Sequence, residues 1–248
     1  MKISIITVCY NSENTIEKTF QSLQNQTYNN IEYIVVDGYS KDGTKRIIEN
    51  YKDIIFKFIS EKDKGLYDAL NKGLALATGD LIGILNSDDV FTNDRVLENI
   101  AKFHLNNSVD ASVSNVVQFN EKGKVIRKYS AKNWNPKKLK IGFMPPHPAI
   151  FFKRVLFDKF GDYHLGFHIC ADYELITRFF LKHEISWKFF DITTNSMLIG
   201  GLSSSGFNSY RIVSKEIIKS LTINKIKFSS LTIYSRFFWK IIGFLNKK

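Results

Sequence analysis

Residues 81–90, which read LIGILNSDDV, combine a short apolar run with two adjacent carboxylates. An apolar run of this length, bounded by Gly79-Asp80 and by polar residues, indicates a buried strand. Ligands of open α/β sheets bind outside the carboxyl ends of the strands, so acids placed there can hold a hard divalent cation against a phosphate. The alternative is that these polar residues only cap a helix that begins near Asn93.

Two earlier segments repeat this pattern. Residues 3–8 and residues 31–36 are apolar runs that end in polar residues and precede helical periodicities. A third helix, about residues 65–77, is expected between a strand at residues 54–60 and the acidic strand. The alternating order predicts an α/β fold with a mostly parallel, doubly wound sheet flanked by helices. Repeated polar strand ends are typical of a nucleotide site at a topological switch point.

Composition limits the class of protein. A chain of 248 residues with 44% hydrophobic residues can bury a core, which excludes a disordered class. The two cysteines, Cys9 and Cys170, predict a reducing cytoplasm without a disulfide. The 35 Lys and Arg against 24 Asp and Glu call for an anionic partner. No zinc-ligand spacing, RNA-binding signature or helix-turn-helix pattern accompanies the charge, so we expect no nucleic-acid partner.

The C-terminal residues 201–248 are expected to form a glycine and serine loop followed by basic amphipathic helices. Residues 231–245 are too short to span a bilayer, and Arg236 and Lys240 interrupt them. Their aromatic density and basic flanks favour a helix that lies on an anionic leaflet. This predicts a peripheral protein on the inner face of the cell membrane. A closing helix that packs on the domain is the alternative.

The order of several motifs resembles that of family 2 glycosyltransferases of the GT-A fold, over roughly the first three quarters of the chain. The motifs are residues 7–11 (TVCYN), 35–44 (VVDGYSKDGT), 71–73 (NKG), 86–89 (NSDD) and 171–175 (ADYEL). The chain looks most like bacterial enzymes that build capsule, O-antigen and exopolysaccharide repeat units.

The resemblance implies an inverting, metal-dependent hexosyl- or N-acetylhexosaminyltransferase. Its donor would be a nucleotide sugar, most simply a UDP-sugar, its cofactor Mn²⁺ or Mg²⁺, and its acceptor a hydroxyl of a glycan or lipid-linked molecule. The GT-A domain is expected at residues 1–200, with a nucleotide-sugar half at about 1–105 and an acceptor half at about 106–200.

The resemblance also implies where the donor and metal bind. Asp88 is the first metal ligand and Asp89 the second candidate, because Asn86 stands where the family's Asp-x-Asp pattern has its first acid. Asp37 would accept hydrogen bonds from the uracil or the ribose. Leu70 stands where the family often has an arginine for the diphosphate, a contact that could pass to a nearby lysine. The expected donor-binding residues are Thr7, Tyr10, Asn11, Asp37, Lys64, Asp68, Asn71, Lys72, Ser87 and Asp88.

The acceptor hydroxyl needs a base, and the resemblance assigns this role to Asp172. The alternative is that Asp172 only caps the helix that follows it; both roles are compatible. His147 lies between prolines and either faces the acceptor or diphosphate or is structural. Residues 200–206 either close over the donor or form a plain linker.

Two other functions remain open. A sugar nucleotidyltransferase would need a glycine-rich basic loop after the first strand, and residues 9–13 contain neither glycine nor a basic residue. A non-catalytic nucleotide-sugar or membrane-binding module would tolerate loss of the metal and base positions.

Overall fold

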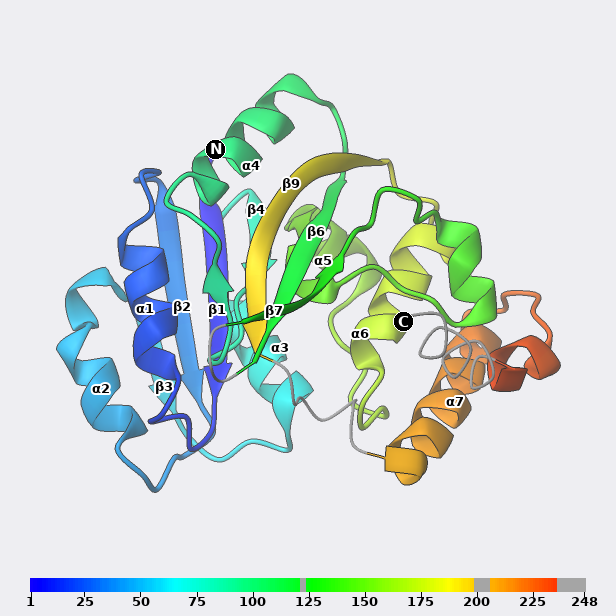
Figure 1. Cartoon of the computed structure of the whole chain (residues 1–248), viewed down its shortest axis with the longest axis horizontal. Helices are drawn as coiled ribbons and strands as arrows, with labels where there is room; N and C mark the ends of the chain where they lie inside the picture. The colour runs from blue at the N-terminus through cyan, green and yellow to red at the C-terminus, as the bar shows by residue number, and fades with distance from the viewer. Residues whose placement is uncertain (121–123, 199–205, 236–248) are drawn as a thin grey trace. The chain divides into compact units, whose positions relative to one another are not determined.

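The computed structural model describes residues 1–120, 124–198 and 206–235 (Figure 1). The chain forms two compact units. Unit 1 comprises Met1–Asn133, Pro145–Tyr163 and Ser186–Ile199, and unit 2 comprises Trp134–Met144, His164–Ile185 and Gly200–Lys248. The domain boundary predicted at residue 200 stays a prediction. Among the helices of the described residues, none is long and apolar enough to cross a membrane.

Unit 1 is built on one sheet in the order β3-β2-β1-β4-β8-β6-β9-β5, with β7 paired to β6. The strands are β1 (Ile3–Cys9), β2 (Ile31–Asp37), β3 (Lys57–Ser60), β4 (Leu81–Ile84), β5 (Val90–Phe91), β6 (Ala111–Phe119), β7 (Val125–Tyr129), β8 (Ile150–Lys153) and β9 (Trp187–Leu198). The helices are α1 (Ile16–Gln24), α2 (Thr44–Asn50), α3 (Leu66–Leu76), α4 (Val96–Asn106) and α5 (Val155–Phe160).

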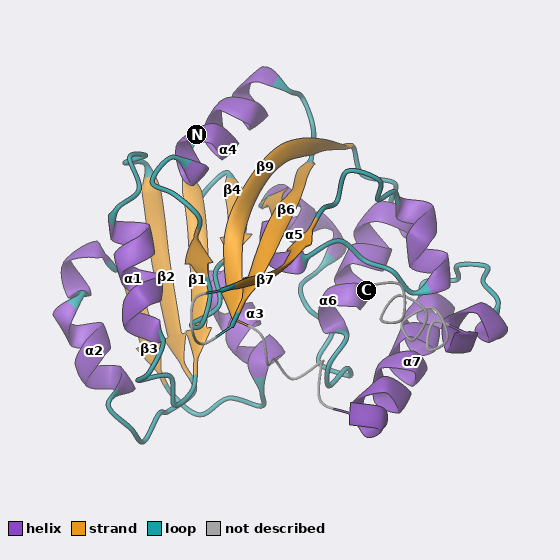
Figure 2. Cartoon of the chain, in the orientation of Figure 1, coloured by secondary structure: helices purple, strands orange, loops and turns teal. Residues whose placement is uncertain are grey.

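Strand β1 is buried along its whole length because helices cover both faces of the sheet (Figure 2). Ile3 and Ile5 join a core with the apolar residues of α1, α2 and α4. Helix α3 packs against the opposite face, where Gly73 approaches Ile6 so closely that a Cβ atom would collide with its side chain. Alternating residues of one strand therefore serve two cores, as the run of apolar residues predicts.

The first four strands of the sheet order are parallel, in agreement with the predicted α/β class. Beyond β4 the pairing becomes mixed: β8 is antiparallel to both β4 and β6, whereas β6 and β9 are parallel. Strands β6 and β7 follow one another in the chain and pair antiparallel. Only five residues lie between these two strands, which is too short for the crossover that a parallel pair would need.

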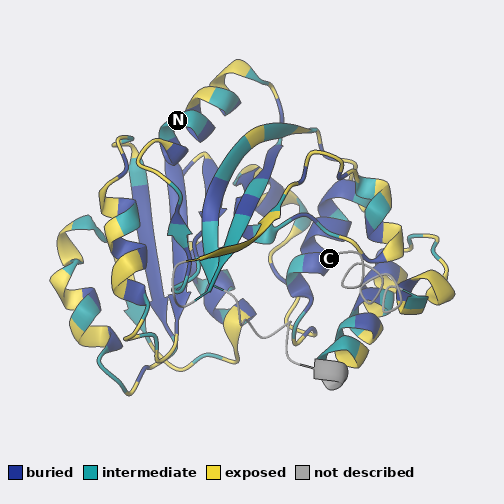
Figure 3. Cartoon of the chain, viewed as in Figure 1, coloured by how far each residue is buried: buried dark blue, intermediate teal, exposed yellow. Residues whose placement is uncertain are grey.

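Unit 2 contains a 3-10 segment, Pro136–Ile141, helix α6 (Ala171–Thr177), a π-helical turn (Arg178–Lys182) and helix α7 (Gly206–Ile223). Helix α6 is buried on most sides, with Tyr173, Leu175 and Ile176 at most 2% exposed (Figure 3). Tyr173 donates its hydroxyl hydrogen to the carbonyl of Leu139, which fastens the 3-10 segment to α6.

The C-terminal segment bears on the tail prediction. Residues 230–235 are helical, Ile233 is fully buried, and the Tyr210 hydroxyl donates to the Tyr234 carbonyl at 2.7 Å. This part of the tail therefore packs on unit 2. Residues 236–248, and residues 200–205 of the predicted loop, lie outside the described residues.

Candidate functional site

The register of the parallel strands brings four polar loops together at one edge of the sheet. Cys9 lies opposite Asp37, Asp37 lies opposite Ser60, and Ile6 lies opposite Ile84. The segments that follow β3, β2, β1 and β4 therefore emerge side by side. They contain most of the residues predicted to bind the donor and the metal.

Asp37 anchors the loop after β2. Its carboxylate is fully buried and accepts hydrogen bonds from the backbone N–H and hydroxyl of Ser40 and, at 2.6 Å, from the hydroxyl of Ser60. Its neighbour Cys9 is buried too, and burial together with the Asp37 charge raises the pKa of the Cys9 thiol. Asp37 thus sets the shapes of two of the four loops.

Thr7 also lies inside the fold. It is fully buried, donates to the Leu85 carbonyl at 2.6 Å and accepts from the Tyr33 hydroxyl at 2.9 Å. Its hydroxyl ties β1 to the end of β4, so it supports the loops from within.

Tyr10, Gly38 and Asp63 converge on the solvent side of the same edge. Tyr10 is 62% exposed. A Cβ atom on Gly38 would collide with the carboxylate of Asp63 and lie 3.5 Å from the ring of Tyr10. Asp63 also accepts a hydrogen bond from the N–H of Gly65 at 2.9 Å. Asp63 was not predicted from the sequence, although it follows β3 as Asp37 ends β2, and that repetition was the available signal.

Two residues of these loops adopt left-handed backbone conformations. Asn11 has φ +50° and Tyr39 has φ +69°, and neither is glycine. The N–H of Asn11 donates to the Ser40 hydroxyl at 2.8 Å, and its side chain accepts from the N–H of Lys41 at 2.9 Å. Because such conformations are uncommon outside glycine and tend to cluster at functional sites, they indicate loops held in a set shape by their neighbours.

The turn after β4 carries the two adjacent acids. Asn86 donates its amide hydrogen to the Asp89 carboxylate at 2.8 Å, and Asp89 is 1% exposed. Asp88 is half-buried, and the Ser87 hydroxyl lies 3.0 Å from that of Ser12. Asn86 therefore holds Asp89 inward, and Asp88 is the more accessible carboxylate.

The surroundings of Asp88 and Asp89 disfavour the charged form of each carboxyl group, so a bound cation would stabilise the two anions. Burial raises the pKa of Asp88, and burial followed by the charge of Asp88 raises the pKa of Asp89 to about 8. Among the described residues, no group of three or more His, Cys, Asp and Glu side chains could hold a metal by itself. The donor set still fits Mg²⁺, which is commonly bound through one or two carboxylates together with substrate phosphates.

The predicted residues of α3 have local partners. Asn71 pairs with the backbone of Tyr163 in both directions, at 2.8 and 2.9 Å. The ammonium of Lys72 lies 2.8 Å from Glu61 and 3.6 Å from Asp68, and the hydrogen bond to Glu61 raises its pKa. Asp68 also accepts from the N–H of Lys64 at 3.0 Å. Asn71 is thus bonded to the backbone of Tyr163 and its predicted contact with the donor stays a prediction, whereas Lys72 lies beside the loop that carries Asp63.

His147 belongs to unit 1 and lies against Tyr163. Its Nε2 is 2.8 Å from the Tyr163 hydroxyl, and burial lowers the pKa of His147 to about 4. The imidazole is therefore neutral at pH 7.

Asp172 belongs to unit 2 and is the second residue of α6. The residue that precedes the helix is Cys170, without a side-chain cap, and the Asp172 carboxylate accepts from the N–H of Tyr173 at 2.7 Å. The alternative that Asp172 is the N-cap is therefore wrong, because the helix begins one residue earlier.

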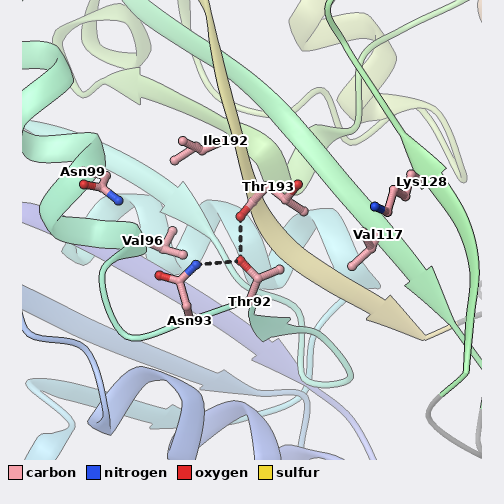
Figure 4. A pocket seen from close by; sticks show the side chains of 8 residues that line it. All are labelled: Thr92, Asn93, Val96, Asn99, Val117, Lys128, Ile192 and Thr193. Atoms are coloured by element: carbon pink, nitrogen blue, oxygen red, sulfur yellow. Dashed lines mark hydrogen bonds between the residues drawn. The ribbon is translucent and has the colours of Figure 1, made fainter.

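A cavity of about 480 Å³ lies elsewhere in unit 1, between the start of α4 and strands β6, β7 and β9 (Figure 4). Thr92 donates to the Thr193 carbonyl at 2.6 Å on its wall, and Lys128 also lines it. None of the residues predicted to bind the donor, the metal or the acceptor, or to act as the base, lines this cavity.

Comparison with known proteins agrees with this geometry. The family model described as Glycosyl transferase family 2 matches residues 4–161. An uncharacterized glycosyltransferase of Mycobacterium tuberculosis is 33% identical over 191 residues, which cover 71% of this chain and 68% of that protein. The chain belongs to glycosyltransferase family 2.

Another relative matches more of the chain. A PGL/p-HBAD biosynthesis glycosyltransferase of Mycobacterium bovis is 28% identical over 229 residues, covering 89% of this chain and 84% of that protein. Two solved structures share the fold. S. aureus TarS 1-349 with UDP-GlcNAc has a TM-score of 0.71 at 20% identity, covering 89% of this chain and 66% of that one. The Pyrobaculum calidifontis mannosyltransferase PcManGT with GDP-Man and Mn²⁺ has a TM-score of 0.65 at 18% identity, covering 95% of this chain and 68% of that one. The predicted family and GT-A fold are confirmed.

Proposed function

We propose that the chain is an inverting glycosyltransferase that moves a sugar from a UDP-sugar to a hydroxyl of a glycan or lipid-linked acceptor in bacterial polysaccharide synthesis. The observation that carries the proposal is the edge of unit 1 where the loops after β1, β2, β3 and β4 meet. It offers an exposed aromatic ring, fixed carboxylates and an accessible acid at the carboxyl ends of parallel strands, where such sheets bind nucleotides.

The nucleoside binds at Tyr10, Gly38 and Asp63. The exposed Tyr10 ring offers a flat surface to a base, and the missing side chain of Gly38 leaves room for the Asp63 carboxylate to accept hydrogen bonds from a base or ribose. Asp37 acts by holding the Ser40 and Ser60 sides of this surface.

Asp88 holds a divalent cation, Mn²⁺ or Mg²⁺, with Asp89 behind it. The cation supplies positive charge to the diphosphate as negative charge grows on the leaving group. The raised pKa of both acids supports this role, because two adjacent, partly desolvated carboxylates are stabilised as anions by a cation. Lys72 lies on α3, beside the loop that carries Asp63, and adds a second positive charge.

Asp172 acts as the base that accepts the proton of the acceptor hydroxyl as that oxygen attacks the anomeric carbon. Its position within the first turn of α6 stabilises the carboxylate anion. Asp172→Asn keeps the shape and removes the proton acceptor, so turnover should fall ~10²- to 10⁴-fold. Donor affinity should hardly change, because the base acts on the acceptor. Full turnover by the folded variant would rule Asp172 out as the base.

A thermal-shift screen tests the donor proposal directly. A ligand that binds only the folded protein raises the midpoint by mass action. UDP-sugars should stabilise the protein more than CDP- or GDP-sugars and more with Mn²⁺ than without it. Equal shifts with all three nucleotides, or no shift, would contradict the proposal.

The protein also binds an anionic membrane surface through its C-terminal residues. Basic side chains outnumber acidic ones by more than two to one in the described residues of unit 2, whereas the two nearly balance in those of unit 1. Because Ile233 is buried, the test uses a truncated chain that ends after Ser235 and so keeps Ile233 in place. The truncated chain should lose binding to anionic vesicles while transfer to a short soluble acceptor persists. Unchanged vesicle binding would refute the membrane proposal.

A further inference from the structure

Helix α7 is fastened to the segment that leads into α6. The carboxylate of Glu216 accepts three hydrogen bonds from consecutive backbone N–H groups: His168 at 2.7 Å, Ile169 at 2.9 Å and Cys170 at 2.8 Å. The bond from His168 goes to Oε1 and the other two go to Oε2. One side chain of α7 thus fixes the three residues that precede α6.

Glu216 binds the backbone just ahead of α6 and does not act as an N-cap, whose side chain would accept from the N–H of Asp172 or Tyr173. The backbone N–H groups around a helix start have no partner within the helix and are usually satisfied by a nearby polar side chain. Cys170, at the cap position of α6, makes no such bond. The bonds to a charged acceptor are stronger than ordinary ones, so the Glu216 carboxylate gives this segment a defined position.

Lys219 and Asn224 make three further contacts with the residues before and within α6. The ammonium of Lys219 donates to the Gly166 carbonyl at 2.7 Å and lies 4.8 Å from the centre of the Phe167 ring. At the end of α7, the amide of Asn224 donates to the buried carboxylate of Glu174 at 3.0 Å. Contacts on both sides of the start of α6 therefore fix its place relative to α7.

We propose that Glu216 is the positioning residue for Asp172, which lies two residues beyond the last N–H that Glu216 holds. This inference rests on the proposed role of Asp172 as the base. Glu216 does not touch the substrate; it sets the position from which the Asp172 carboxylate meets the acceptor hydroxyl. A displacement of about 1 Å in a reacting group can lower the rate ~10²-fold, so a loosened segment should affect turnover more than binding.

Glu216→Gln is the main variant. It keeps the length of the side chain but turns one accepting oxygen into an N–H₂ group that meets backbone donors. We expect kcat to fall about 10- to 100-fold, with the donor Kd within about twofold of wild type, because the donor residues lie in unit 1. Glu184→Gln removes an exposed acid of the same unit and is the matched control, which should keep wild-type kcat. Glu216→Ala repeats the measurement without the new donor.

A double-mutant cycle with Asp172→Asn separates positioning from a general structural effect. If Glu216 acts through Asp172, Glu216→Gln should lower turnover by less than about twofold in the Asp172→Asn background. The same 10- to 100-fold loss in that background would overturn the inference, as would wild-type kcat in both Glu216 variants. Variants that are unfolded at every temperature would also overturn it, since Glu216 would then be needed for the fold. Full turnover by Asp172→Asn alone would instead refute the proposed base.

Discussion

The buried carboxylate of Glu32 should make a pH-dependent contribution to the free energy of unfolding. Four donors converge on it: the ammonium of Lys2 at 2.6 Å, the hydroxyl of Ser4 at 2.6 Å, and the N–H and hydroxyl of Thr78, both at 2.7 Å. They join β1, β2 and the turn before β4 at the end of the sheet opposite the candidate site. Burial raises the pKa of Glu32, but the hydrogen bonds outweigh it and lower the pKa to about 2.

Glu32→Gln should therefore destabilise the fold at neutral pH. The difference between about 2 and the ordinary value of 4.5 corresponds to about 3 kcal/mol of unfolding free energy while Glu32 is ionised. Because the folded-state pKa is the lower one, this stability is complete above pH 4.5 and is lost as the pH falls from 4.5 toward 2. Urea unfolding at several pH values should show a steep loss in wild type over this range and a flatter profile in the variant.

Glu49→Gln is the matched control for this measurement. Its side chain is 70% exposed and pairs with Lys52 at 3.2 Å on the surface, so the change should stay within about 0.5 kcal/mol. Donor affinity of folded Glu32→Gln should match wild type. Equal stability of Glu32→Gln and wild type at pH 7, or parallel pH profiles, would refute the reasoning.

Three further outcomes follow from buried groups and the metal site. Asp88→Asn should abolish the Mn²⁺-dependent part of UDP-sugar binding in calorimetry while the melting curve stays cooperative; wild-type turnover at saturating Mn²⁺ would remove Asp88 from the metal site. Thr7→Val should lower the free energy of unfolding by about 1–3 kcal/mol, because it leaves the Tyr33 hydroxyl buried without its acceptor. The affinity for the donor should stay unchanged. Weakened UDP binding would instead indicate that Thr7 contacts the donor. The His147 imidazole should remain neutral in NMR titrations down to about pH 5, because burial lowers its pKa to about 4. The unfolding free energy linked to this group should be lost as the pH falls from 6.5 to 4. Protonation of His147 near pH 6.5 would contradict its burial.

The sequence predicted the fold well where periodicity and strand ends repeat. Apolar runs at residues 3–8 and 31–36 lie within β1 and β2, and the parallel register follows from the helices between them. The antiparallel return of β8 between β4 and β6 was not predicted. Such pairing depends on contacts between segments far apart in the chain, which local patterns do not record.

The candidate site was predicted in part, and untested roles remain predictions. The strand ends located Asp37 and Asp88, but pattern alone cannot show whether a polar side chain faces solvent or the interior, as with Thr7 and Asn71. Asp63 was missed because its meeting with Gly38 depends on the pairing of β2 with β3. Glu216 was missed for the same reason, since 46 residues separate it from Cys170.

The contact between Tyr210 and Tyr234 also matters for the design of shortened or fused chains. Ile233 and the Tyr234 carbonyl belong to the packed interior and edge of unit 2, so a cut before residue 233 would open a hole against α7. Because α7 holds the segment in front of α6, we expect such a cut to disturb the position of the proposed base Asp172 as well. An affinity tag or partner domain is therefore better joined after Ser235, beyond the described contacts between α7 and residues 233–234.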